Sequence, residues 1–110
     1  MRKGLPVVAA ALAVAGFAAL PSGAATTTKT VAVKDDFFKP KKLTIAKGTK
    51  VKWVWKGKRR HNVSVASGPK MFRASTRKKG TYTHTFKKKG KYLIFCTIHA
   101  PDMQMKITVK

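Results

Sequence analysis

The most informative stretch of the sequence is FCTIHAPDMQM, residues 95–105. It contains the only cysteine of the chain, Cys96, followed by His99 and two methionines. A thiolate, an imidazole and a thioether are ligands that select a soft transition metal such as copper over magnesium or calcium. Such a site usually needs a second imidazole, and His61 in the sequence RHNV is the best candidate. The pattern predicts a copper centre with one cysteine and two histidines in a plane and a weak axial methionine.

The residues around this stretch predict short β-strands. Residues 91–96 lead into the cysteine with Tyr92, Ile94 and Cys96 on one face, and residues 50–55 alternate charged with large apolar side chains. Similar patterns predict seven strands, at residues 30–33 (an edge strand), 42–46, 50–55, 61–65, 81–86, 91–96 and 104–110. Residues 35–40 and 67–80 are expected to be connections. We therefore expect an all-β protein, a Greek-key β-sandwich of about seven to eight strands.

The motifs resemble those of the plastocyanin/amicyanin-like family of cupredoxins. Cys96-Thr97-Ile98-His99, then Met103, after an upstream His61-Asn62, carry the resemblance, together with the strand over residues 91–96 and the hairpin over residues 43–53. The resemblance covers roughly all of residues 25–110, the part of the chain that follows an expected signal peptide. It implies a blue type 1 copper protein that carries one electron between redox partners, with Asn62 tying the two ligand loops together. It also implies that His99, beside Ala100 and Pro101, presents a largely apolar edge for electron transfer.

The axial ligand is the point at which the sequence departs from the family pattern. Three residues separate His99 from Met103, whereas the family commonly has two or four. Met103 is the favoured axial ligand because the family places this ligand in the loop. Met105 is the alternative, although its position fits the inward alternation of the last strand.

The N-terminus predicts export. Arg2 and Lys3 precede an apolar run, and residues 22–25 are small, which is typical of a signal peptide over residues 1–24 with cleavage after Ala24 or Ala25. A copper-binding domain over residues 25–110 would then reach the periplasm or the extracellular space with no transmembrane anchor. One cysteine cannot form an internal disulfide, so in an exported protein it is expected to be a ligand.

The charge of the chain is strongly basic. There are 25 Lys and Arg residues against 3 Asp and no Glu, for a formal net charge of +22. This predicts a redox partner with an acidic docking surface and non-specific attraction to anionic envelope polymers. Strand directions place the basic residues 56–60 and 77–79 near the metal and residues 87–89 far from it. No specific nucleic-acid binding is expected, because the spacing of Trp53 and Trp55 is that of a strand core.

The sequence does not indicate an enzyme. Asp35 and Asp36 are adjacent and cannot easily share a strand face, so they do not suggest a catalytic carboxylate pair. His84 lies between apolar residues and is expected to be a packed strand histidine, not a ligand. Two alternative functions remain open: a copper-delivery protein without an electron-transfer role, and a basic polyanion-binding module.

Overall fold

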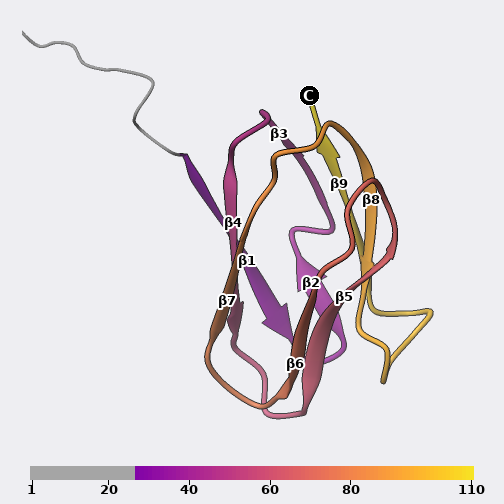
Figure 1. Ribbon diagram of the computed structural model, residues 1–110. Helices are drawn as coiled ribbons and strands as arrows, with labels where there is room; N and C mark the ends of the chain where they lie inside the picture. The colour runs from indigo at the N-terminus through magenta and orange to yellow at the C-terminus, as the bar shows by residue number, and fades with distance from the viewer. Residues whose placement is uncertain (1–26) are drawn as a thin grey trace, which may run out of the picture.

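The computed structural model describes residues 27–110, which form two β-sheets packed as a sandwich (Figure 1). The expected signal peptide, residues 1–24, and its cleavage after Ala24 or Ala25 lie outside the described residues. The strands in chain order are β1 (Thr28–Lys34), β2 (Phe37–Lys39), β3 (Lys42–Ile45), β4 (Lys50–Trp55), β5 (His61–Ser67), β6 (Arg73–Arg77), β7 (Thr81–Thr85), β8 (Gly90–Phe95) and β9 (Gln104–Val109). The all-β sandwich expected from the sequence is confirmed.

The chain passes repeatedly between the two sheets. One sheet has the strand order β2-β1-β4-β7, and the other has the order β3-β9-β8-β5-β6. The pairs β1–β4 and β3–β9 are parallel, and the remaining pairs are antiparallel. Strands that are distant in sequence therefore lie side by side, so that residues from several segments can meet at one end of the sandwich.

The core follows from the alternation of side chains along the strands. Val51, Trp53 and Trp55 of β4 are buried while their neighbours are not, and β9 shows the same period. Trp53 is fully buried against Phe72, Tyr82 and Phe86, with ring centroids about 6 Å apart, which is the usual range for aromatic pairs. The two tryptophans are core residues, as their spacing predicts.

Three features of the strands differ from the sequence-based expectation. The first strand is not an edge strand, because β1 lies between β2 and β4. Residues 37–39 form the short edge strand β2, which was expected to be loop, and residues 73–77 form β6 within the expected long connection. Neither segment shows a readable period: β2 has one inward residue, Phe38, and β6 has only the small Ala74 facing the core.

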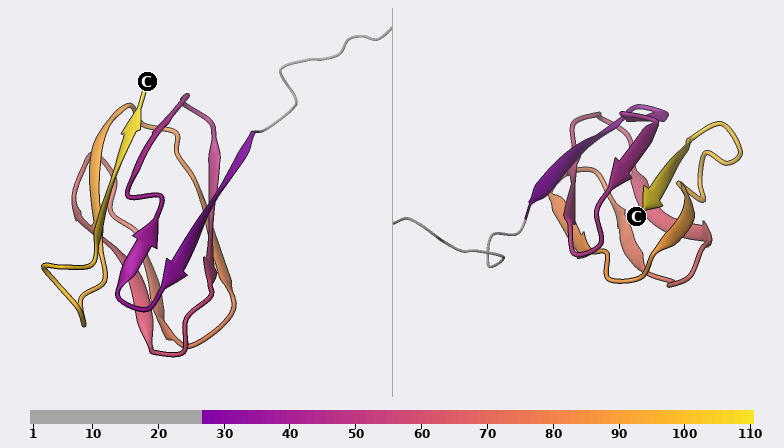
Figure 2. Two further views of the ribbon diagram at one scale, coloured as in Figure 1. Left: turned by 180° about the vertical axis from the view of Figure 1, so that it is seen from behind. Right: turned by 90° about the horizontal axis from the view of Figure 1, so that it is seen from above.

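The predicted metal ligands lie at one end of the sandwich, which we call the site end. It comprises the β1–β2 turn and the β4–β5, β6–β7 and β8–β9 connections. His61 pairs with Arg77, and the amide of Trp55 donates to the carbonyl of Gly80, so residues 77–80 are at this end. Phe86 pairs with the β3–β4 turn, which places residues 87–89 at the opposite end. Figure 2 shows the β8–β9 loop far from the C-terminus. The expected placement of the basic clusters is confirmed.

No segment of residues 27–110 forms a helix with the length and hydropathy required to cross a bilayer.

Candidate metal centre

Cys96 lies at the start of a compact loop between β8 and β9. Its amide donates to the carbonyl of Met103 at 3.1 Å, and the amide of Met103 donates to the carbonyl of His99 at 3.2 Å. The amide of His99 donates to the carbonyl of Cys96 at 3.2 Å. These bonds fold the loop back on itself, so the imidazole and the thiol approach each other although the loop has no regular secondary structure. Cys96 and Met103 are fully buried.

His61 begins β5 and is fixed by contacts with β4 of the other sheet and with β6 of its own sheet. Its carbonyl accepts a hydrogen bond of 3.0 Å from the indole Nε1 of Trp55, which is buried at the end of β4. The guanidinium of Arg77, opposite His61 on β6, lies 5.1 Å from the centre of the Trp55 ring. The side chain of His61 is completely buried. Its position is thus determined by the sandwich and not by a flexible loop.

The structure brings together the thiol and the two imidazoles that the sequence singles out. One ligand atom from each of His61, Cys96 and His99 lies within 4.8 Å of the other two. The two imidazole rings are 5.0 Å apart between centroids, and Nδ1 of His61 is buried without a hydrogen-bond partner in the described part of the chain. A buried unpaired nitrogen facing a thiol is costly unless it binds something. The His61, Cys96 and His99 cluster fits a type 1 copper site.

Asn62 joins the two segments that carry the ligands. Its backbone amide lies 3.4 Å from Sγ of Cys96 and donates to it. Its side-chain oxygen accepts from the amide of Thr97 at 3.0 Å, and its side-chain nitrogen donates to the hydroxyls of Thr97 at 2.8 Å and Thr76 at 3.1 Å. Because Asn62 is fully buried, this network holds the cysteine loop against the start of β5.

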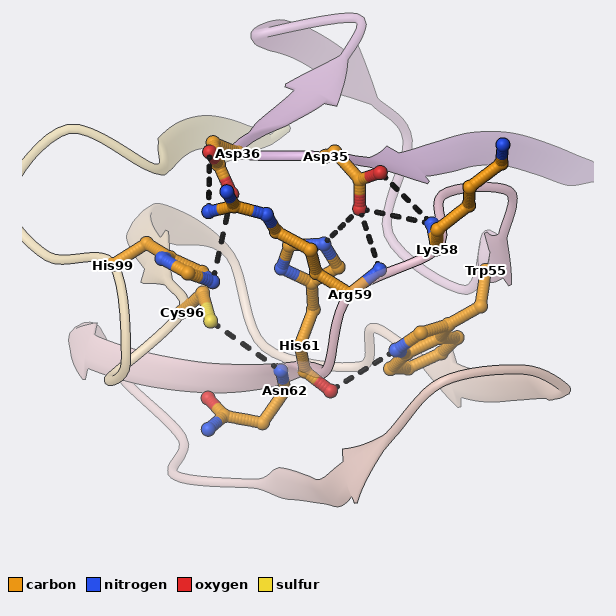
Figure 3. Close-up of polar contacts among 9 residues, drawn as sticks. All are labelled: Asp35, Asp36, Trp55, Lys58, Arg59, His61, Asn62, Cys96 and His99. Atoms are coloured by element: carbon orange, nitrogen blue, oxygen red, sulfur yellow. Dashed lines mark hydrogen bonds and ion pairs between the residues drawn. The ribbon is translucent and has the colours of Figure 1, made fainter.

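Two carboxylates that the sequence analysis set aside also face this cluster (Figure 3). Oδ1 of Asp35 lies 3.0 Å from Nε2 of His61. The same carboxylate accepts hydrogen bonds from the amide of Lys58 at 2.8 Å and 3.0 Å, and from the amide of Arg59 at 2.9 Å. The pKa of Asp35 is held well below its ordinary value by the Lys58 amide above all, then by His61 and the Arg59 amide.

Asp36 approaches the second imidazole less closely. Its carboxylate lies 3.5 Å from Nε2 of His99 and 3.4 Å from the guanidinium of Arg59 (Figure 3). The side chain of His99 is 21% exposed and its Nε2 is covered. The exposed apolar side chain beside it is that of Ile98, at 51%. The apolar edge expected at His99 is therefore partly covered by the ion pair of Asp36 and Arg59.

The sequence did not predict that both carboxylates face the site, because adjacent side chains on a strand point to opposite faces. Asp35 and Asp36 form the turn between β1 and β2, and Asp36 has a φ of 73°, in the left-handed region. This conformation allows both side chains to face the site end. The composition of the sequence held the one signal that could have pointed to these carboxylates: two of the three acidic residues in a strongly basic chain are adjacent.

The remaining candidate residues are two methionines and the third histidine. Met103 is in the ligand loop, whereas Met105 is in β9 opposite Ile94, and both are buried. His84 stacks on Phe72 with ring centroids 3.9 Å apart, which confirms that it is a packed strand histidine.

The comparisons with known proteins agree with this geometry. A family model described as a cupredoxin-like domain matches residues 7–109. The chain belongs to this family. The comparison with curated proteins gave no match.

Solved structures similar to this cupredoxin-like chain include copper proteins. A Cu(I) structure of an amicyanin variant has a TM-score of 0.67 and 25% sequence identity, over 76% of this chain and 82% of that chain. The reduced state of another amicyanin variant has a TM-score of 0.66 and 25% identity, over 80% and 85%. A copper-containing nitrite reductase from Thermus scotoductus SA-01 has a TM-score of 0.65 and 30% identity over 89% of this chain, which corresponds to only 24% of that chain.

Proposed function

We propose that this protein is a small blue copper protein that carries single electrons between redox partners. His61, Cys96 and His99 would hold the copper, and Met103 would supply a weakly bound thioether. The observation that carries the proposal is the convergence of one thiol and two imidazoles within 4.8 Å at one end of a β-sandwich. The amicyanin similarity supports the same function.

The candidate metal ligands are held rigidly and are largely shielded from water. His61 and Cys96 are fully buried, and His61 is held by its place at the start of β5. The Asn62 amide donates to the Cys96 sulfur, which ties this side chain to the start of β5. Bound copper would supply the one-electron couple between Cu(II) and Cu(I). Donors held in fixed positions need little rearrangement when the charge at the site changes, which favours fast electron transfer.

The partner is proposed to carry an acidic docking surface. Exposed basic residues surround the site end, in the β4–β5 connection and at Lys78 and Lys79. The exposed Ile98, Ala100 and Pro101 provide an apolar contact beside His99. We further propose that the mature domain, residues 25–110, is exported to the periplasm or the extracellular space, where the positive charge also attracts anionic envelope polymers.

A carrier function is favoured over catalysis by the extent of the matches. The similarity to the nitrite reductase is confined to 24% of that chain, whereas the amicyanin structures are matched over more than four fifths of their length. We therefore propose that the chain is not an enzyme.

Titration with Cu(II) followed by absorption spectroscopy tests the proposed function. We expect one equivalent of Cu(II) to give an intense blue colour through thiolate-to-copper charge transfer, and Cys96→Ser to abolish it. The matched control is Met105→Leu, which leaves the thiolate in place. Colourless copper binding by the wild type would rule out the type 1 site. Blue protein that rapidly transfers copper to an acceptor but exchanges electrons slowly would favour copper delivery.

A further inference from the structure

The two ring nitrogens of His61 have different surroundings. Nδ1 is buried and has no hydrogen-bond partner among residues 27–110, whereas Nε2 lies 3.0 Å from Oδ1 of Asp35. A neutral imidazole carries one proton, and the nitrogen that faces a carboxylate acceptor is the one that holds it. The Asp35 contact therefore selects the tautomer in which Nδ1 keeps its lone pair free.

Asp35 is itself held in place by the chain that leads to His61. The amides of Lys58 and Arg59, in the β4–β5 connection, both donate to its carboxylate. The carboxylate packs so closely on this connection that a Cβ at Gly57 would overlap it. One side chain from the β1–β2 turn thus fixes both the imidazole and the backbone that precedes it.

We propose that Asp35 is the positioning residue of His61, which keeps Nδ1 directed at the metal, and that its charge lowers the reduction potential of the centre. This inference rests on the proposed function. A fixed negative charge next to a ligand favours the more positive Cu(II) state over Cu(I). In a chain with a formal net charge of +22, which favours Cu(I), this local carboxylate acts in the opposite direction.

Asp36 provides a matched control one residue away. It carries the same charge and lies near the other imidazole, but it makes no hydrogen bond to Nε2 of His99. Its side chain is 46% exposed, against 36% for Asp35, and it pairs with Arg59, so the guanidinium offsets part of its effect on the centre. Asp35→Asn and Asp36→Asn remove the same charge, but only the first removes the charge that orients a ligand.

The first measurement compares the metal-free wild-type protein with the two Asn variants. Nitrogen NMR of the histidine side chains should show the neutral form of His61 protonated at Nε2. Asp35→Asn should shift the population toward the Nδ1-protonated form, and Asp36→Asn should leave it unchanged. Because this measurement does not involve copper, it separates the role of Asp35 from the proposed function.

The second measurement compares the copper-loaded proteins. We expect Asp35→Asn to raise the reduction potential more than Asp36→Asn and to weaken Cu(II) binding by roughly 10- to 100-fold. Asp35→Glu should recover part of both properties. Equal shifts from the two Asn variants, or wild-type His61 protonated at Nδ1, would overturn the role of Asp35. Failure of the wild type to bind copper would instead overturn the proposed function.

Discussion

Met103 and Met105 are separated by one residue but belong to different structural elements. Met103 lies in the ligand loop, where its backbone bonds to Cys96 and His99. Met105 faces the core from β9, opposite Ile94. Proximity to the ligands in the loop favours Met103 as the axial thioether, and strand alternation explains Met105 without a metal.

Replacement of each methionine by leucine distinguishes the two roles. Met103→Leu should change the reduction potential and the visible spectrum, because an axial thioether tunes the centre. Met105→Leu conserves core volume and should cost less than about 1.5 kcal/mol of stability with an unchanged spectrum. Potentiometry and absorption spectra of both variants provide the measurement. If only Met105→Leu alters them, the axial ligand is Met105.

The sequence identifies at residue scale the donors whose chemistry is distinctive. A single cysteine, an HN pair and a CTIH motif are recognisable without knowledge of the fold. The Asp35–Asp36 turn cannot be recognised in this way. Its role depends on the left-handed backbone at Asp36 and on hydrogen bonds from the distant β4–β5 connection to the carboxylate of Asp35. Contacts between distant segments have no local pattern in the sequence.

At the scale of the elements, the sequence predicts the strands that have several side chains facing the core. Strands β4, β8 and β9 bury alternate large residues, so their period is visible in the sequence. The short β2 and the polar β6 depend on pairing with β1 and β5 and have too few apolar residues to show a period. The parallel pairing of β1 with β4, which makes β1 an interior strand, is a property of topology and not of local sequence.

Strand β7 carries a titratable group whose burial makes stability depend on pH. Burial first, and the positive charge of Lys70 second, lower the pKa of His84 from its ordinary value of 6.5. The unfolded chain therefore takes up a proton at this residue more readily than the folded protein does. Its contribution to stability is complete above pH 6.5 and is lost as the pH falls through that value toward the lower pKa of the folded state.

Urea unfolding of the metal-free protein at about pH 7.5 and about pH 5 should show this effect. We expect the free energy of unfolding to fall less on acidification in His84→Gln than in the wild type. The two proteins differ only at residue 84, so the difference between their pH dependences isolates His84. Identical pH dependences would contradict the prediction. The loss of the stack on Phe72 lowers the stability of the variant at both pH values and does not affect the comparison.

On the scale of the whole molecule, the charges are unevenly distributed. All three acidic residues are at the site end, two in the β1–β2 turn and Asp102 in the β8–β9 loop. Within residues 27–110, the opposite end has the lysines of residues 87–89 and no acidic side chain. The site end thus has side chains of both charges, whereas the charged side chains of the far end are all positive.

Charge reversal at the two ends tests whether position or net charge steers the partner. Lys56, Lys78 and Lys79 are replaced with Glu at the site end, and Lys87, Lys88 and Lys89 at the far end. Lys58 and Arg59 are left intact because their amides hold Asp35 and the Arg59 side chain pairs with Asp36. The measurement is the bimolecular rate of electron exchange with an anionic probe, hexacyanoferrate, at several ionic strengths.

We expect the site-end variant to slow the reaction more than the far-end variant. The difference should shrink with added salt, because the screening length is only about 10 Å at 0.1 M. An equal decrease of the rate in the two triple variants would mean that net charge alone controls it. The proposed docking surface would then be wrong.

The position of β9 gives the protein a particular order of assembly during synthesis. The sheet β2-β1-β4-β7 is complete once residue 85 has emerged, whereas β9 lies between β3 and β8 in the other sheet. A growing chain therefore has His61 long before Cys96 and His99, and its second sheet closes only with residues 104–109. Before Cys96 and His99 are made, the growing chain has only His61 of the three clustered donors, and all three are held together only when the last strand takes its place.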